Sequence, residues 1–468
     1  MRRLGLVFAL VLATSGCTWA QRVDVDRDGT TPATAADHAR DVAVDFQGDH
    51  YTFITPVGLV PEDTNGTDDV YQATADTSSG GGAQLVPTAA DIGSYSFKGT
   101  LYGTEVFFTS GLALTPDDTN THPDVYVRDV GTESLERVSV ATAGEISGSL
   151  GAVLDDVSRD GHFAVFTVTK TNGPHLYYRN RTTGTTTEVT LATGQHFAGI
   201  SASGAVLLLL TDGAGAKTIT IKTTFTTSVD TPKCKVTDAV LSPGAYWVLG
   251  AFVGGTGCPT GLARYEWGSA PPVYESIPVP SGATPVPVGL DDDSNFALWR
   301  ADDGSKQYFV TSIATGRTQR VSEGGFPPQP VPVDAAALSD DGSSVALLAA
   351  TPFPGAGPDN GANGVFEHST MEPVVDVPRP TSLARGSDTF GVRVFLHDSF
   401  EMQRYLVSFG EGVHVQLTSA GHFDGTTDLL VHVTVDADAK RGVRNVTVIE
   451  IHRWGYTVGT CIACFTVT

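Results

Sequence analysis

Short apolar runs alternate with polar turns along most of the chain. Examples are Val157–Val168, Ile200–Leu210 and Leu338–Ala349, in which a turn containing Gly leads into a run rich in Val, Leu, Ala or Phe. Glycine beside Asp or Ser suits tight hairpins, because these turns need backbone angles that Gly tolerates. Long runs with helical periodicity are missing. The pattern therefore predicts an all-β chain of many short strands.

One stretch of this pattern occurs twice. Residues 53–71 read FITPVGLVPEDTNGTDDVY, and residues 108–126 read FTSGLALTPDDTNTHPDVY. Each copy predicts a strand, a polar loop and a second strand that begins at Asp-Val-Tyr. Internal duplication of this kind is the signature of a repeat architecture.

Related units follow one another along the chain, and each predicts four strands. We place them near residues 42–88, 92–141, 154–191, 194–231, 236–280, 287–323 and 334–378. Four strands at this spacing are typical of propeller blades. A series of sandwich domains is the alternative, although sandwiches rarely repeat one strand–turn–strand phrase so often. We therefore expect a seven-bladed β-propeller over residues 41–378.

Three phrases carry a family resemblance. The turn phrase SxDGxxVAF, the loop phrase LVPxDTNGxxDVYVRD and the strand phrase TxxVSV resemble the WD-like repeats of the periplasmic Tol-system (TolB-like) propeller and related secreted bacterial proteins. The resemblance spans residues 21–378 and is thin in the fourth to sixth units. It implies that a strand at Arg22–Val25 closes the ring beside the last blade. Val374–Val377 competes for the same place.

The chain changes character after Pro380. The phrase VTVDADAKRGVRNVTV at residues 433–448 and the ending CIACFTVT resemble bacterial immunoglobulin-like domains of the IPT/TIG kind. The length of residues 379–468 suits one such domain. We expect a small Ig-like β-sandwich over this range.

The N-terminus has the order of an export signal. Arg2 and Arg3 precede the apolar run Leu4–Ala13, and Thr14-Ser15-Gly16-Cys17 follows. Small residues before a cysteine resemble a bacterial lipobox, so residues 1–17 are interpreted as a lipoprotein signal peptide with Cys17 as the lipidated residue. An ordinary secretory signal is the alternative. Residues 18–40 then form an N-terminal strand and linker.

The charge of the chain narrows the class of partner. The chain has 29 Lys and Arg against 52 Asp and Glu. Loss of the signal peptide with Arg2 and Arg3 leaves 27 basic residues and a net charge of −25. Such a surface repels phosphate backbones, which excludes nucleic acid as a partner. The lipid anchor then provides the contact with the membrane. We expect an extracytoplasmic protein anchored to a bacterial membrane, facing the periplasm or the cell surface.

Four cysteines remain after Cys17 is assigned to lipid. In an exported chain an even set favours disulfides, and local pairing would join Cys234 to Cys258 and Cys461 to Cys464. A redox motif would need a βαβ context, which the pattern lacks. A zinc site would require the two pairs to meet across domains.

The two copies of the duplicated loop, Pro56–Asp69 and Gly111–Asp124, are expected on the same face of the ring. Their acidity would attract a partner with a basic patch. The candidate binding residues are Glu62, Asp63, Asn65, Asp68, Asp69, Asp117, Asp118, Asn120 and Asp124. The alternative is that Asp and Asn only brace the loops through turns of their own backbone.

A weak metal motif lies before the propeller. Asp24, Asp26 and Asp28 alternate ahead of Gly29, like the opening of a calcium loop. Ala35 stands where such a loop needs a bidentate acid. A solvated acidic turn is the alternative, and no other cofactor is expected.

Catalytic motifs are missing from the sequence. It contains no Gly-x-Ser-x-Gly elbow and no His-x-x-x-His pair. We therefore expect an envelope-anchored, non-enzymatic binding scaffold for a protein or glycan partner. The alternative is a propeller enzyme, a glycosidase or lyase, with acids gathered at the central mouth.

Overall fold

The computed structural model is all-β. It describes residues 20–24, 39, 41–45, 48, 50–61, 63–64, 66, 68–74, 84–85, 97–99, 103–224, 229–230, 232–324, 329–349, 351, 364–370, 374–397, 404–423, 426–451 and 456–468. Its regular elements over these residues are the strands β1–β38. Nowhere in the described ranges does a helix occur that is long and apolar enough to cross a membrane.

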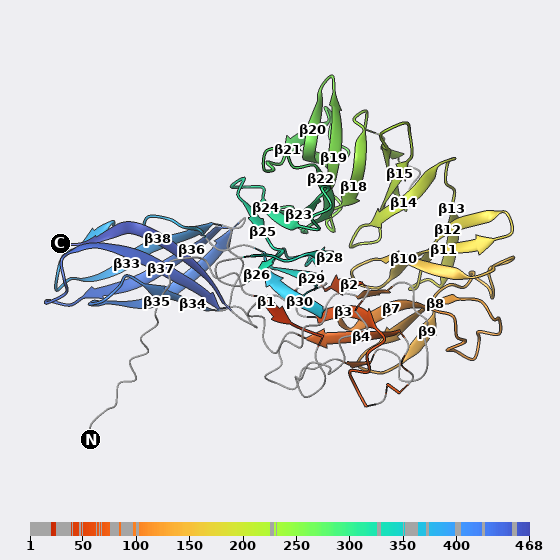
Figure 1. Cartoon of the computed structure of the whole chain (residues 1–468), viewed down its shortest axis with the longest axis horizontal. Helices are drawn as coiled ribbons and strands as arrows, with labels where there is room; N and C mark the ends of the chain where they lie inside the picture. Colours follow the sequence, from red (N-terminus) through yellow and green to blue (C-terminus); the bar gives the residue numbers. More distant parts are fainter. Residues whose placement is uncertain are drawn as a thin grey trace.

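Seven four-stranded antiparallel sheets form a β-propeller (Figure 1). The first two blades are β2 (Val42–Val44), β3 (His50–Thr55), β4 (Asp69–Thr74), β5 (Gln84–Leu85), and β6 (Phe97–Gly99), β7 (Glu105–Ser110), β8 (Asp124–Asp129), β9 (Leu135–Arg137). The third and fourth are β10 (Ala152–Val157), β11 (Phe163–Lys170), β12 (Gly173–Asn180), β13 (Thr185–Val189), and β14 (Gln195–Ile200), β15 (Val206–Thr211), β16 (Thr218–Thr223), β17 (Val229–Asp230).

The remaining blades follow the same plan. The fifth and sixth are β18 (Val236–Leu241), β19 (Trp247–Gly255), β20 (Cys258–Glu266), β21 (Val273–Ser276), and β22 (Pro285–Leu290), β23 (Phe296–Ala301), β24 (Tyr308–Ser312), β25 (Thr318–Arg320). The seventh contains β28 (Val333–Leu338), β29 (Ser344–Ala349), β30 (Gly364–Ser369) and β1 (Ala20–Arg22). A two-stranded sheet of β26 (Glu323–Gly324) and β27 (Gln329–Pro330) precedes it.

The first strand of each blade lies nearest the propeller axis. These strands contact one another in an unbroken cycle of β2, β6, β10, β14, β18, β22 and β28. Five of them, β10, β14, β18, β22 and β28, have an irregular register with the second strand of their blade. Such bulges bend a strand and increase its twist. The ring centre is therefore built from bent inner strands and the turns that follow them.

The ring is closed by the N-terminal strand. β1 pairs antiparallel with β30, with Ala20 opposite His368 and Arg22 opposite Phe366. The closing strand thus lies slightly earlier than the expected Arg22–Val25. The alternative closing segment, Val374–Val377, does not pair with the last blade. Its residues Val374–Val375 form β31, which pairs with β33 of the C-terminal domain. The last propeller strand therefore ends at Ser369, earlier than the expected boundary at residue 378.

The apolar core lies between neighbouring blades. In one cluster Val165 and Leu176 of the third blade pack with Leu207 and Leu209 of the fourth. Both faces of a middle strand are covered in this way, which explains why such strands are continuously apolar. All six residues of β29 are buried. The packing of blade on blade accounts for the short, uninterrupted apolar runs of the sequence.

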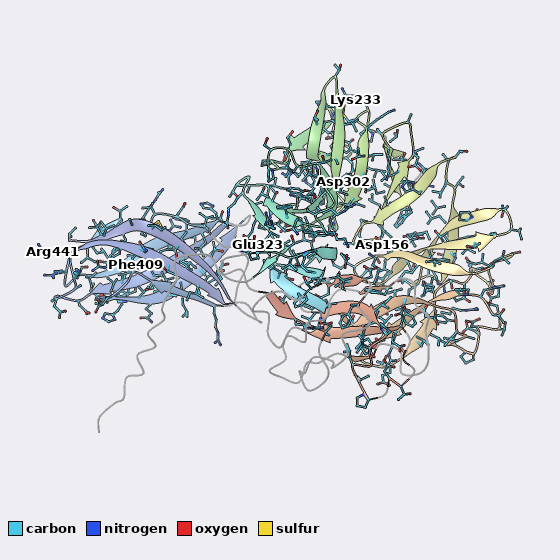
Figure 2. All side chains as sticks on the ribbon, viewed as in Figure 1. Asp156, Lys233, Asp302, Glu323, Phe409 and Arg441 are labelled. Carbon is cyan, nitrogen blue, oxygen red and sulfur yellow. A yellow bond between two sulfur atoms is a disulfide. The ribbon has the colours of Figure 1, made fainter. Side chains whose placement is uncertain are left out.

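The C-terminal domain is a β-sandwich of two four-stranded sheets. One sheet has the order β31 (Val374–Val375), β33 (Asp388–His397), β36 (Thr426–Val435), β35 (Val413–Phe423). The other has the order β32 (Ser382–Leu383), β38 (Tyr456–Val467), β37 (Gly442–Ile451), β34 (Arg404–Ser408). Valines of both sheets share one core with Phe409, which lies inside the domain (Figure 2).

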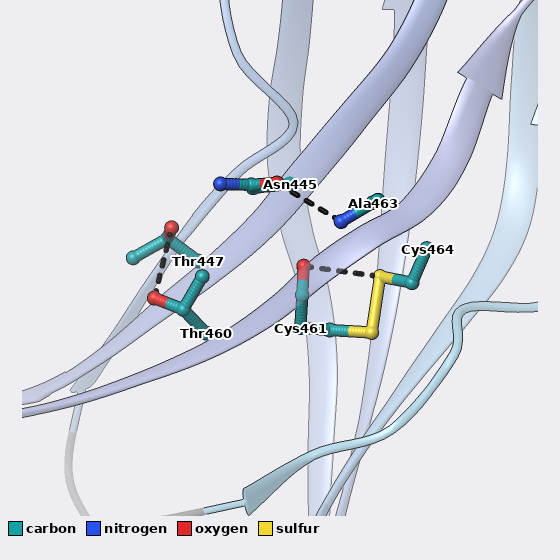
Figure 3. Close-up of a disulfide and its surroundings, with 6 residues drawn as sticks. All are labelled: Asn445, Thr447, Thr460, Cys461, Ala463 and Cys464. Carbon is teal, nitrogen blue, oxygen red and sulfur yellow. Dashed lines mark hydrogen bonds between the residues drawn. A yellow bond between two sulfur atoms is a disulfide. The ribbon is translucent and has the colours of Figure 1, made fainter. Parts of the chain in front are cut away.

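Two disulfides join the cysteine pairs that are close in sequence. Cys234, before β18, is bonded to Cys258 at the start of β20, so this bridge lies within the fifth blade. Cys461 is bonded to Cys464 inside β38 (Figure 3). The amide of Ala463 between them donates to the side-chain oxygen of Asn445 at 2.9 Å. Cys17 lies outside the described residues.

Candidate functional site

In the first copy of the duplicated loop, an aspartate is tied to the following strand. The Tyr71 hydroxyl donates a hydrogen bond to Asp63 and accepts one from the Leu59 amide at 3.3 Å. The Tyr71 ring stacks on Phe53 with centroids 6.0 Å apart. Burial, and secondly the bond to Asp63, raise the pKa of Tyr71 far above its usual value, so this hydroxyl stays a donor. Four of the duplicated positions therefore form one internal tie.

The second copy repeats the tie. The Tyr126 hydroxyl donates to Asp118 and accepts from the Leu114 amide at 3.4 Å, and Tyr126 stacks on Phe108 at 6.0 Å. Asp118 is buried. Asp63 and Asp118 are thus each bonded to a tyrosine of the following strand, whereas the alternative offered by the sequence was bracing through turns of the loop's own backbone.

The second copy also surrounds a buried arginine with acids. Arg137 in β9 is only 3% exposed. Its guanidinium nitrogens lie 3.3 Å from Asp117, 3.4 Å from Asp118, 3.5 Å from Asp124 and 2.6 Å from Glu145. This cluster, which we call the Arg137 cluster, neutralises part of the acidic loop from within.

Asp124 has further hydrogen-bond partners within the Arg137 cluster. Its carboxylate accepts hydrogen bonds from Ser139 at 2.6 Å and from the Asn120 amide group at 2.9 Å. Burial raises the pKa of Asp124, and the bonds from Ser139 and Asn120 and the charge of Arg137 oppose this rise. Asp117 differs, because its side chain is 62% exposed and a hydrogen bond from Thr115 leads the causes that lower its pKa.

The predicted loop residues therefore divide into two groups. Asp69, Asp118 and Asp124 are buried, whereas Asp117 faces solvent and Asp68 is partly exposed. Glu62 and Asn65 lie outside the described residues. The exposed acids are the ones that a partner could reach.

Asp24 of the predicted calcium motif is used inside the propeller. It is buried and accepts a hydrogen bond from Arg22 Nε at 2.7 Å. Both side chains lie close to Gly364 of β30, where a Cβ atom would collide with them. Burial raises the pKa of Asp24 to about 6, although Arg22 opposes this. Asp24 thus supports the ring closure; Asp26 and Asp28 lie outside the described residues.

Metal ligation finds no other support. Within the part of the chain that the structure describes, no group of three or more His, Cys, Asp or Glu side chains could hold a metal ion.

At one mouth of the ring, a second arginine reaches across the axis. Arg159, in the turn after β10, lies 3.0 Å from Asp292 of the sixth blade and 3.0 Å from Asp340 of the seventh. Burial raises the pKa of Asp340 to about 6, and the charge of Arg159 opposes this rise. Three turns from different blades are thereby linked through one guanidinium.

Backbone hydrogen bonds join the same turns around the mouth. The Arg159 amide donates to Ala202 O at 2.9 Å, the Ala202 amide donates to Pro243 O at 2.8 Å, and the Asp292 amide donates to Asp340 O at 2.6 Å. Side chains and backbone therefore both brace this end of the ring.

Two adjacent carboxylates lie deeper, on the inner strand of the third blade. Asp155, at the bulge of β10, accepts a hydrogen bond from Thr167 at 2.8 Å, and burial raises its pKa to about 6. Asp156 lies near the ring centre (Figure 2), 3.8 Å from Lys98 of the second blade, and accepts a bond from the Ile200 amide at 3.4 Å. Acids from several blades thus converge on the axis, each with a partner.

Sequence reasoning missed both arginines. Arg137 stands in a strand where the pattern predicts only an edge position, and its acids come from other segments. Arg159 carries a weak signal, because the corresponding turns have Ala202, Pro243 or an aspartate in its place. A lone basic residue at a turn position that is otherwise small or acidic is the pattern that could have found it.

The comparisons with known proteins concern the fold alone. The chain is similar in structure to TolB from Acinetobacter baumannii, with 16% identity and a TM-score of 0.37 over 60% of this chain and 64% of that chain. It is also similar to prolyl oligopeptidase B from Galerina marginata, with 11% identity and a TM-score of 0.46 over 78% and 56%. Acylaminoacyl peptidase from Pyrococcus horikoshii gives 7% identity and a TM-score of 0.47 over 80% and 59%.

The chain therefore spans less than two thirds of each of these proteins. No family model matches the chain, and no curated protein sequence matches it either. The assignment of a β-propeller rests on the strand pairing described above.

Proposed function

We propose that the protein is an envelope-anchored, non-enzymatic binding scaffold for a protein or glycan partner. Lipid at Cys17 attaches it to a bacterial membrane, and the Ig-like sandwich follows the propeller as an accessory module. The observation that carries the proposal is the internal bracing of the duplicated loops, which leaves Asp117 exposed on an ordered loop.

Bracing favours recognition because a loop that is already ordered loses little conformational entropy when a partner binds. The Tyr–Asp ties and the Arg137 cluster supply this order, and Asp117, although it contacts Arg137 at 3.3 Å, keeps 62% of its side chain in solvent. The chain has a net charge of −23. Its field would attract a partner with a basic patch, and the exposed loop acids would orient that partner.

Charge reversal at Asp117 tests the proposal. The full chain carrying Asp117→Lys is compared with wild type by crosslinking in cells, followed by identification of the crosslinked partners. Loss of a partner, at an unchanged melting temperature, is the expected result. The interaction with wild type should also weaken as salt rises.

Asp303→Lys is the matched control. Asp303 is an exposed acid in the corresponding loop of the sixth blade and accepts the Ser305 amide at 2.8 Å. This variant changes the net charge equally and should keep the partner. If Asp117→Lys retains every partner that wild type captures, the duplicated loops are not the binding surface.

Anchoring is tested separately. Wild type should incorporate labelled palmitate, and Cys17→Ala should lose the label and the membrane attachment. Equal labelling of both proteins would contradict the anchor but leave the binding test untouched.

An enzyme acting on a glycan is the second candidate, favoured by Asp155 and Asp340, whose pKa values burial raises to about 6. Against it, Asp340 is paired with Arg159 and Asp155 accepts a hydrogen bond from Thr167, so each carboxyl already has a partner within the protein. Release of sugar from purified envelope polysaccharide by wild type, lost in Asp155→Asn, would favour the enzyme over the scaffold.

A further inference from the structure

The outer face of one sandwich sheet carries an exposed aromatic ring. Along β36 the side chains alternate strictly, with Val431 and Val433 buried in the core and His432 and Thr434 on the outer face. Phe390 of the neighbouring β33 lies on the same outer face and is 71% exposed. A large exposed apolar side chain indicates a binding surface when the local backbone conformation directs it into solvent.

A β-bulge in β33 directs Phe390 into solvent. The register between β33 and β36 shifts between Thr389 and Val392, and Gly391 within the shift has a φ of 79°. Bulges of this kind re-aim a side chain. The shift places one extra residue in β33, and without it the alternation that buries Val392 and Val394 would turn Phe390 inward as well.

The ring of Phe390 lies flat on an imidazole. Its centroid is 3.7 Å from that of His432, and the two planes differ by 9°. His432 is in turn hydrogen-bonded to Asp388, which also accepts the Thr434 hydroxyl at 3.0 Å. The phenyl ring therefore has one covered face and one open face, and its orientation is fixed from below. We call Phe390 and His432 the ring platform.

Polar groups with fixed orientation surround the ring platform. His414 is hydrogen-bonded to Asp436 at 3.0 Å, and Gln416 lies opposite His432 in the strand register. Farther along the same face, Arg393 Nε donates to Asp428 at 3.2 Å. Each of these acids is thus bonded to a basic side chain of the same face, so the platform has a border of donors and acceptors with little unpaired charge.

From this arrangement we infer that the outer face of the β31–β33–β36–β35 sheet binds a neutral, β-linked pyranose chain. A pyranose whose hydroxyls and glycosidic bonds are all equatorial, as in a β-linked glucan, has a flat face of C–H groups, which stacks on the electron-rich face of an aromatic ring. An axial α-linkage bends the chain away from such a flat surface. Its hydroxyls lie at the rim, where the paired polar groups can meet them. A cationic partner fits less well, because the nearby carboxylates are already bonded. The inference concerns the sandwich and does not depend on the propeller loops.

The face extends beyond one sugar. The Arg393 guanidinium lies 5.1 Å from the centre of the Phe395 ring, and Phe395 is paired with Asp428. His432 and Asp428 are four residues apart on β36, a distance of roughly 13 Å along a strand. An oligosaccharide can contact both the ring platform and this arginine, whereas a monosaccharide can contact only one.

Titration calorimetry with defined sugars tests the inference. The full chain is titrated with cellohexaose and chitohexaose, and with the α-linked maltohexaose as a comparison. We expect binding of at least one β-linked chain, weaker binding of its monosaccharide, and no binding of maltohexaose. Phe390→Leu, which keeps an apolar side chain but removes the flat ring, should weaken binding about tenfold, and Phe390→Tyr should retain it.

Ile462→Ala is the control for exposed apolar surface. Ile462 is 76% exposed and belongs to the other sheet, so this change should leave the affinity unaltered. Melting temperatures of all variants should equal that of wild type, because both side chains lie in solvent. Binding of none of the sugars, equal binding of maltohexaose, or wild-type affinity in Phe390→Leu would each overturn the inference.

Discussion

The two copies of the duplicated loop have the same frame and different electrostatic surroundings. In both, a tyrosine of the second strand donates to a loop aspartate and stacks at 6.0 Å on a phenylalanine of the first strand. In the second copy the residue paired with that tyrosine in the next strand is Arg137, whereas in the first copy it is Leu85. Only the second copy therefore has a cation at this register position.

The difference shows which part of a repeat is held by duplication and which part by its neighbourhood. The tie needs four residues that all lie within the repeated phrase. Neutralisation of the buried Asp118 and Asp124 needs Arg137, which lies beyond the phrase. A repeated loop can thus keep its shape while its charge balance is set separately in each blade.

Removal of Arg137 should have the largest effect. Arg137→Met leaves buried carboxylates without their cation, which typically costs about 3–5 kcal/mol of unfolding free energy. The lowered midpoint of chemical unfolding measures the loss. Arg300→Met is the control, because the Arg300 side chain is 42% exposed and its acidic neighbour Asp302 is 4.0 Å away. Equal losses of unfolding free energy in the two variants would mean that Arg137 contributes no more to stability than an exposed arginine does.

Acid should partly rescue Arg137→Met. Burial already raises the pKa of Asp124, so the folded protein binds a proton at higher pH than the unfolded chain does. Stability then rises as pH falls through the folded pKa toward the unfolded value. Loss of Arg137 raises that folded pKa further, and each additional unit returns about 1.4 kcal/mol on acidification.

Unfolding midpoints of wild type and Arg137→Met between pH 8 and 5 measure this rescue. The gap between the two proteins should narrow as pH falls. A gap that stays constant would show that the deficit comes from lost packing and not from the buried carboxylate.

Removal of the tyrosine hydroxyls should lower the unfolding free energy less than removal of Arg137 does. Tyr71→Phe and Tyr126→Phe each remove a hydroxyl that satisfies a loop aspartate, a loss of about 1–3 kcal/mol. Tyr126 and Arg137 both contact Asp118, so their double mutant should deviate from additivity by more than 0.5 kcal/mol, roughly the limit for independent sites. Tyr71 belongs to another blade, and its combination with Arg137→Met should be additive. Coupling of similar size in both pairs would contradict separate charge balances.

The smallest effect is expected at Asp117. Its side chain is 62% exposed, and solvent screens its contact with Arg137. Asp117→Asn should change the unfolding free energy by less than about 0.5 kcal/mol. Thermal unfolding of Asp117→Asn and Asp118→Asn measures the difference. An equal loss of stability in the two variants would mean that Asp117 also holds the loop in place.

Much of the propeller could be predicted because its signals are local. Hairpin turns, most of them with Gly, and continuous apolar strands recur along the ring, and both follow from backbone geometry and from burial between blades. The boundary between the propeller and the C-terminal sandwich was less predictable. Val374–Val375 reads as a strand in either domain, and only the pairing with β33 assigns it to the sandwich.

The sites were harder to predict because their parts are far apart in the sequence. Asp63 and Asp118 could be interpreted as braces, since each tie lies within one phrase. Arg159 meets Asp340 across 181 positions, and nothing local indicates that contact. Phe390 is exposed through a register shift, and alternation alone predicts neither the shift nor the stacking on His432.

The pairing of β1 with β30 has a consequence for how the chain assembles. The two strands come from opposite ends of the propeller, so the ring stays open until nearly the whole domain has been synthesised. An open ring has two complementary ends, an unpaired N-terminal strand and an unpaired edge on the seventh blade. The β1 strand of one copy fits the β30 edge of the next as well as its own. Delayed closure would therefore lead to strand-swapped chains of molecules joined head to tail.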